Sequence, residues 1–152
     1  MDKGGSEWDG RRPLPTKLSL SLLQAFGYHS TAGEAVTKPV SELTAEDCAF
    51  DIGEATAAEY AKLLGEAKTI VWNGPVGAFE VVPFDKGSRA LADILAGCDA
   101  YTLVCGGDTV AAVEAFGVAD KMGYLSTGGG AFLEVLEGKT LPAVAALADC
   151  AK

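Results

Sequence analysis

Short apolar runs alternate with stretches in which apolar residues recur at helical spacing. The mostly apolar stretches that read as strands are three to five residues long and end at or near glycine, asparagine or serine, which is typical of buried strands. They predict strands over 48–52, 68–72, 101–104 and 124–126. The stretches between them predict helices that begin near a polar residue or proline and end near glycine, over 54–65, 85–96, 109–117 and 131–137. A last helical turn or two is expected over 142–148.

The N-terminal third has a weaker pattern. Residues 1–12 are polar and rich in glycine, which predicts a flexible lead, so that the folded domain extends over 13–152. Leu18, Leu20 and Leu22 alternate with serine at strand spacing. Residues 27–46 are interpreted as a connector with a short extended piece near 36–40.

Regular alternation of strand and helix predicts an α/β fold: a Rossmann-like, doubly wound parallel sheet with helices on both faces in three αβα layers. In such sheets the ligand lies beyond the carboxyl ends of the strands. Three loops follow predicted strands directly and should converge there. They are Asn73-Gly74-Pro75, Gly106-Gly107-Asp108-Thr109 and Gly128-Gly129-Gly130.

The two glycine turns point to phosphate chemistry. Glycine lets the backbone turn sharply and approach a ligand closely, and we expect Asp108 and Thr109 to cap the helix that follows the first turn. Unpaired N–H groups and the helix dipole then favour an anion. A structural interpretation stays open, because one such loop is also an ordinary strand–helix connection.

Two carboxylates are candidates for further roles. Asp108 lies beside the first glycine turn, where a carboxylate suits Mg²⁺ that also contacts phosphates, although it could serve only as a helix cap. Glu80 follows the Asn73 loop and could hold ribose hydroxyls, although by itself it is an ordinary surface residue.

Charge and composition exclude several classes of function. The net charge of −9 argues against nucleic-acid binding through phosphates. No apolar run reaches the ~20 residues of a membrane span, and Met1 is not followed by the apolar core of a signal peptide. The four cysteines are scattered and there is one histidine, which favours reduced thiols in a cytoplasmic protein over a zinc site.

From about residue 40 onward the chain resembles phosphoglycerate kinase. The resemblance rests on five stretches in the order and spacing of that family's C-terminal part, and Asp51-Ile52-Gly53 fits as well. The stretches are Trp72-Asn73-Gly74-Pro75-Val76-Gly77-Ala78-Phe79-Glu80, Gly106-Gly107-Asp108-Thr109, Phe116-Gly117-Val118-Ala119-Asp120-Lys121, Ser126-Thr127-Gly128-Gly129-Gly130-Ala131 and Leu136-Glu137-Gly138-Lys139-Thr140-Leu141-Pro142. Two positions depart from the family's pattern: Cys105 replaces a usual third glycine, and Ala78 replaces a larger aliphatic residue that packs on the adenine.

The resemblance implies a glycolytic kinase that transfers a phosphoryl group between 1,3-bisphosphoglycerate and ADP, in which the C-terminal domain binds MgADP or MgATP. It implies that Glu80 contacts the ribose, that Asn73, Gly74 and Pro75 form one wall of the cleft, and that Asp108 holds Mg²⁺. Gly106, Gly107 and Thr109 would line the nucleotide phosphates, and Gly128, Gly129 and Gly130 would face the phosphoryl group in transfer.

The chain is less than half as long as the family's enzymes, and it contains no counterpart of their 3-phosphoglycerate site. We therefore expect a truncated chain, half of a two-domain kinase, that is not active alone. Two other hypotheses stay open: a non-catalytic nucleotide-binding module, and an inert fragment that forms homodimers through an exposed sheet edge.

Overall fold

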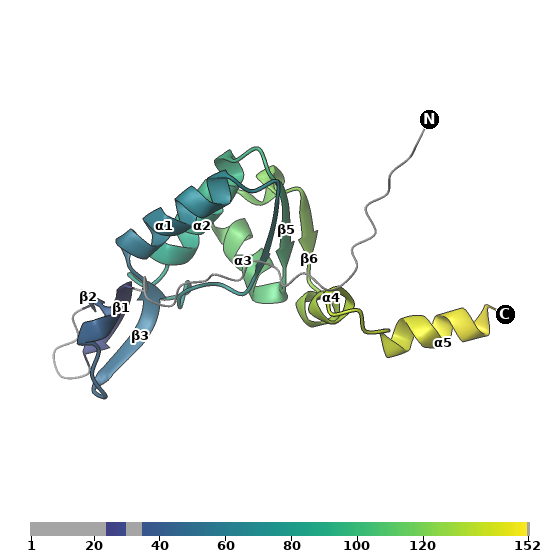
Figure 1. Ribbon diagram of the computed structural model, residues 1–152, viewed down its shortest axis with the longest axis horizontal. Coiled ribbons are helices and arrows are strands. Elements are labelled where there is room, and N and C mark those ends of the chain that lie inside the picture. The colour runs from purple at the N-terminus through teal and green to yellow at the C-terminus, as the bar shows by residue number, and fades with distance from the viewer. Residues whose placement is uncertain (1–23, 30–34, 152) are drawn as a thin grey trace.

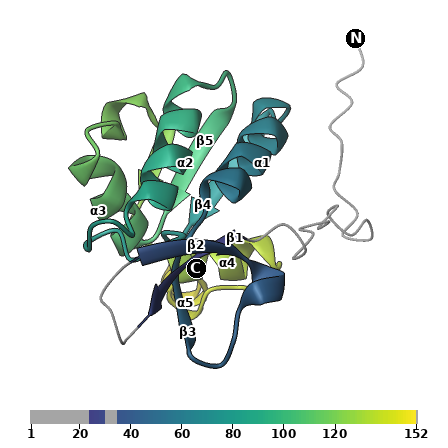
Figure 2. The same cartoon turned by 90° about the vertical axis from the view of Figure 1, so that its left-hand side faces the viewer.

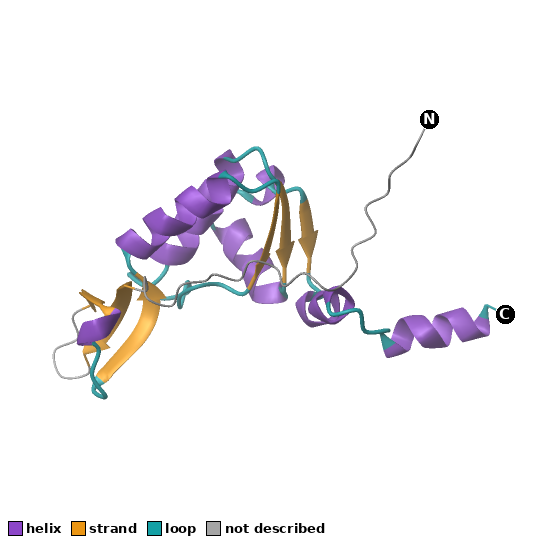
Figure 3. Ribbon diagram, viewed as in Figure 1, coloured by secondary structure: helices purple, strands orange, loops and turns teal. Residues whose placement is uncertain are grey.

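The computed structural model describes residues 24–29 and 35–151, with strands in two separate groups (Figure 3). The predicted flexible lead over 1–12 and the predicted strand at 18–22 lie outside the described residues. Each group of strands is a three-stranded sheet, in the order β2-β1-β3 and β4-β5-β6. The α/β class is confirmed, and the chain divides its strands between an antiparallel and a parallel sheet.

The first sheet is antiparallel and is built from β1 (Gln24–His29), β2 (Ala35–Pro39) and β3 (Asp47–Ile52). Here the sequence interpretation was wrong in part, because it placed the strand over 48–52 in the parallel sheet and treated 27–46 as a connector. The short extended piece that it expected near 36–40 is present as β2. A short hairpin can pair without a crossover helix, so these strands need no βαβ unit. An ion pair between Lys38 Nζ and Asp47 Oδ1, at 2.6 Å, links β2 to β3.

The second sheet is parallel and contains β4 (Thr69–Asn73), β5 (Tyr101–Cys105) and β6 (Tyr124–Ser126). Its register pairs Asn73 with Cys105 and Cys105 with Ser126. The last residues of all three strands therefore lie side by side, which brings the three loops that follow them to one rim of the sheet.

Five helices accompany the sheets, and Figures 1 and 2 show α1, α2 and α3 together on one face of the parallel sheet. The helices are α1 (Glu54–Gly65), α2 (Lys86–Gly97), α3 (Gly107–Ala115), α4 (Gly129–Leu136) and α5 (Pro142–Cys150). Two short 3-10 helices, η2 (Val40–Glu42) and η3 (Ala119–Lys121), complete the described elements. No helix in the described part of the chain is long and apolar enough to cross a membrane.

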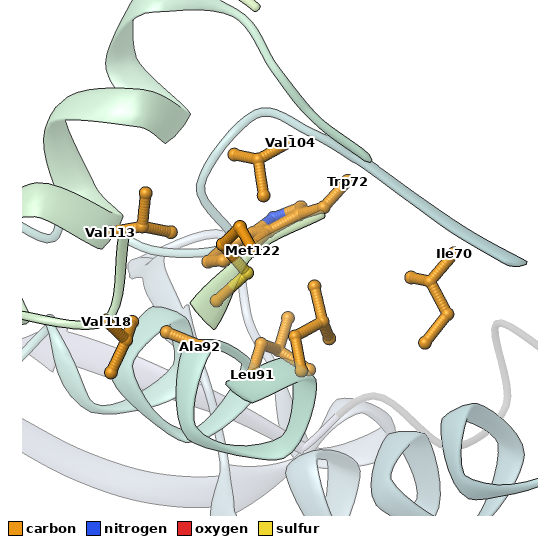
Figure 4. Close-up of a cluster of buried hydrophobic side chains, with 9 residues drawn as sticks. Ile70, Trp72, Leu91, Ala92, Val104, Val113, Val118 and Met122 are labelled. Carbon is orange, nitrogen blue, oxygen red and sulfur yellow. The ribbon is translucent and has the colours of Figure 1, made fainter. Parts of the chain in front are cut away.

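The hydrophobic core lies between the parallel sheet and these helices (Figure 4). Every second residue of the strands points into it, as the period of a strand requires. The cluster consists of Ile70, Trp72, Leu91, Ala92, Leu95, Val104, Val113, Val118 and Met122. Leu91 and Leu95 of α2 are buried, 6% and 3% exposed.

The opposite face of the parallel sheet is open within the described residues. Val71, Tyr101 and Tyr124 belong to the strand positions that alternate with the core, and they are 42%, 53% and 57% exposed. The prediction placed helices on both faces, whereas the described helices that form the core cover one. This face is an exposed apolar surface of the kind that marks an interaction site.

The core predicts a clear difference between two leucine substitutions. Leu91→Ala should lower the free energy of unfolding by about 2–5 kcal/mol, because it leaves a cavity beside Trp72. Leu63→Ala, at a position that is 59% exposed on α1, should change it far less. Urea denaturation measures both, and equal effects would contradict the assignment of the core.

Candidate functional site

Three loops meet at the carboxyl rim of the parallel sheet. A Cβ atom at Gly129 would lie 2.5 Å from Asn73 Oδ1 and 2.9 Å from the Cα of Gly106, so the three segments are already in contact. A Cβ at Gly106 would likewise lie 2.8 Å from Asn73 Oδ1. Asn73, Gly106 and Gly129 thus come together as the sequence predicted, and glycine is required where the backbones approach this closely.

Hydrogen bonds join the same loops. The Gly74 N–H donates to Thr109 Oγ1 at 2.7 Å, which ties the first loop to α3. The Gly106 N–H donates to the Ser126 carbonyl at 2.8 Å, which ties the second loop to the third. The Trp72 indole N–H donates to the Gly74 carbonyl at 2.8 Å and so orients the start of the first loop from the core side.

The first glycine turn differs in detail from the sequence interpretation. Gly106 is the N-cap of α3, with a φ of +95° that favours glycine, and no side chain caps the helix. The prediction that Asp108 and Thr109 cap this helix was therefore wrong, since both lie inside its first turn. The hydroxyl of buried Thr109 serves Gly74 instead, and Asp108 is exposed to solvent.

The second glycine turn starts its helix two residues earlier than predicted. The helix α4 begins at Gly129 with Gly128 as its N-cap, and the Gly128 N–H donates to Ser126 Oγ at 3.2 Å. The amides of Gly74 and Gly106 thus join separate segments of the rim, and the amide of Gly128 bonds within its own turn. The first-turn amides of α3 and α4 have no partner within their own helices, and they are the groups that remain for an anion. Gly107 and Gly130 face open space.

Pro75 and Glu80 lie on the long loop that follows β4. This loop runs along α3, because Gly74 contacts Thr109 at the start of the helix and the Phe79 ring meets Phe116 at its end, with ring centres 6.3 Å apart. A nine-residue helix is about 13 Å long. The structure therefore places the exposed carboxylate of Glu80 toward the far end of α3 from the glycine turns. Pro75 is half-buried in the same loop.

The rim holds few groups that titrate. Burial raises the pKa of the Cys105 thiol, which favours an inert neutral side chain at the end of β5. In the described part of the chain no group of three or more His, Cys, Asp or Glu side chains is placed to hold a metal ion. Asp108 offers a carboxylate beside the glycine turn, which suits an ion whose other ligands are phosphates and water.

Sequence reasoning missed two residues that shape this region. Ser88 accepts the Val76 N–H at 3.1 Å through its Oγ and so holds the first loop against α2. Asp51, noted only as part of a resemblance, is buried at the end of β3 and contacts the same loop. An acid inside a predicted buried strand, two residues before Gly53, was the one available signal for Asp51.

The chain is similar to known proteins of one family. The family model described as phosphoglycerate kinase matches residues 13–139. The phosphoglycerate kinase of Coxiella burnetii is 46% identical over 86% of this chain, with a TM-score of 0.75. The enzyme of Pyrococcus horikoshii OT3 is 32% identical over 83% of this chain, with a TM-score of 0.70. This chain spans 34% and 31% of those two chains, about a third of their length.

The close contact of the loops predicts that two neighbouring glycines respond in opposite ways to the same substitution. Gly129→Ala should push the loops apart and destabilise the protein by about 1–3 kcal/mol, because its Cβ would overlap Asn73 Oδ1 and the Gly106 backbone. Gly130→Ala in the same helix meets open space and should be neutral or stabilise by up to about 1 kcal/mol. Thermal unfolding of both variants measures the difference, and equal tolerance would show that the loops do not touch.

Proposed function

Because the chain belongs to the phosphoglycerate kinase family, we propose that it carries the MgADP- and MgATP-binding side of phosphoryl transfer between ADP and 1,3-bisphosphoglycerate. The observation that supports this most is the meeting of Asn73, Gly106 and Gly129 at one rim, beside the starts of two helices. Helix starts present N–H groups and a favourable dipole to phosphate.

Each rim residue has a role in the proposal. Gly106, Gly107 and Thr109 line the nucleotide phosphates, and Gly128, Gly129 and Gly130 face the phosphoryl group that is transferred. Asn73, Gly74 and Pro75 form a wall of the nucleotide site. The position of Glu80 toward the far end of α3 supports a role at the ribose, because the intervening phosphates separate the ribose of a nucleotide from its terminal phosphate.

The proposed magnesium site fits the residues present. Asp108 is exposed in the first turn of α3, where its carboxylate would share the ion with the nucleotide phosphates. Magnesium would supply positive charge that offsets the charge of the phosphates in a chain of net charge −9. Phosphoryl transfer depends chiefly on positioning the reacting groups and on neutralising their charge. In the proposal, the fixed amides at the rim contribute to both by donating hydrogen bonds to the phosphates.

We propose that this chain binds nucleotide without completing the transfer by itself. Its sequence holds no counterpart of the basic residues that bind phosphoglycerate in the family, so the acceptor would not be held in line with the nucleotide. A second candidate, self-association, is favoured by the exposed apolar face of the parallel sheet, around Val71, Tyr101 and Tyr124.

Calorimetric titration with MgADP tests the proposal on the chain itself. Saturable one-to-one binding is expected, together with no measurable formation of ATP from 1,3-bisphosphoglycerate and ADP. No binding at millimolar MgADP would remove the nucleotide-binding function. Sedimentation of the same samples would then show whether self-association remains as the property of the fold.

The metal role of Asp108 predicts a selective loss. Asp108→Asn should weaken binding of MgADP about tenfold, because one charged ligand of the ion is lost, and should leave binding of metal-free ADP little changed. Asp120→Asn, in η3 and also exposed, is the matched control and should alter neither. An equal loss with and without magnesium would contradict a role in holding the ion.

A further inference from the structure

A buried carboxylate lies between the antiparallel sheet and the loop that carries Glu80. Asp51 is the penultimate residue of β3 and is 5% exposed. Its Oδ2 accepts the Gly87 N–H at 2.8 Å, and its Oδ1 accepts the N–H of the neighbouring Ile52 at 2.8 Å. Because Gly87 lies in the first turn of α2, the carboxylate occupies the start of that helix.

Two glycines make room for this carboxylate. A Cβ atom at Gly77 would overlap Asp51 Oδ1 and lie 2.5 Å from the Phe84 carbonyl, and a Cβ at Gly87 would overlap the same Oδ1. Gly77 and Gly87 are ten residues apart and border the segment 77–87, which includes Glu80. One side chain of β3 therefore packs against both ends of this segment.

Neighbouring contacts strengthen the same attachment. The Ala78 N–H donates to the Phe50 carbonyl at 2.9 Å, directly beside the carboxylate in β3. The rings of Phe50 and Phe84 lie with their centres 5.2 Å apart. The end of β3 thus holds the segment through backbone, aromatic and carboxylate contacts.

Burying the Asp51 carboxylate costs free energy that an apolar residue at the same position would not cost. Burial raises the pKa of Asp51, the two N–H donors act in the opposite direction, and the nearby charge of Asp85 raises it further. An apolar residue would fill the same space without desolvating a charge. What the carboxylate adds is two directed hydrogen bonds, and these fix the segment in one orientation relative to β3.

We propose that Asp51 is a positioning residue of the nucleotide site, which fixes both ends of the segment 77–87 so that the Glu80 carboxylate is held in place for the ribose. This inference rests on the proposed function, because Asp51 affects nucleotide binding only if Glu80 contacts the ribose. Anchoring both ends of a segment lowers the conformational entropy that the segment loses when a ligand orders it. Asp51 itself does not touch the nucleotide.

The experiment compares Asp51→Asn with the unchanged chain for two ligands, MgADP and Mg-2′,3′-dideoxy-ADP. Asparagine keeps the size of the side chain, but its amide group cannot accept both N–H donors, so one hydrogen bond is lost. Binding of MgADP should weaken about tenfold, whereas binding of the dideoxy nucleotide should change little, because it lacks the hydroxyls that Glu80 would hold. In a Glu80→Gln background the added effect of Asp51→Asn on MgADP should disappear.

Two further variants separate positioning from general stability. Leu91→Ala lowers stability at a core position outside the segment, and it should leave the ratio of the MgADP affinity to the dideoxy-nucleotide affinity unchanged. Gly87→Ala retains the Asp51 carboxylate but displaces it. It should lower the ratio of the MgADP affinity to the dideoxy-nucleotide affinity as Asp51→Asn does, and it serves as the second test if Asp51→Asn folds poorly. Hydrogen exchange at the Ala78 and Gly87 amides gives a readout without ligand. Relative to the unchanged chain, exchange at these amides should be faster in Asp51→Asn and in Gly87→Ala.

The outcomes distinguish the two proposals. Faster exchange together with a lower affinity ratio supports the positioning role. An unchanged exchange rate, or a ratio that stays the same while the chain binds MgADP normally, overturns it. If the unchanged chain does not bind MgADP, the proposed function fails and the positioning role fails with it. If the chain binds MgADP and the affinity ratio is unchanged in Asp51→Asn, only the positioning role fails.

Discussion

The close approach of Gly129 to Asn73 and Gly106 is the constraint on which the arrangement of the loops depends. It follows from the register of the parallel sheet, which aligns the last residues of β4, β5 and β6. With the strand ends aligned, the loops can share hydrogen bonds, and Gly74 and Gly106 donate to Thr109 and Ser126. The core beneath, centred on Trp72 and Val104, keeps that register fixed.

The antiparallel sheet matters to this site through a single strand end. Its last strand, β3, leads directly into α1 and places Asp51 against the first turn of α2. The long loop after β4 is therefore held at three places: by α3 near Gly74, by α2 through Ser88, and by β3 through Asp51. The loop after β4 therefore connects the two sheets, because it continues from a strand of the parallel sheet and bonds to β3 of the antiparallel sheet.

Much of this arrangement could be predicted from the sequence, because it depends on local signals. Strand–glycine–helix order at 101–109 and 124–131 located the two turns, and the parallel sheet brought them to one rim. The antiparallel pairing of 48–52 could not be predicted, because a mostly apolar stretch of five residues does not reveal its partner strand. The roles of Thr109 and Asp51 depend on residues 35 and 36 positions away, and such contacts leave no mark in the local pattern.

The glycine at position 106 has a consequence for the whole protein. With a φ of +95° and a neighbouring side chain in the way, it cannot be exchanged for alanine without strain. Glycine leaves the denatured chain freer than any other residue, so folding must order more conformational freedom at this turn. The usual route to a more thermostable protein, replacing glycine by alanine, is therefore closed at the point where the loops meet. At Gly106 the shape of the rim requires a residue that lowers stability, so additional stability has to come from other positions in the fold.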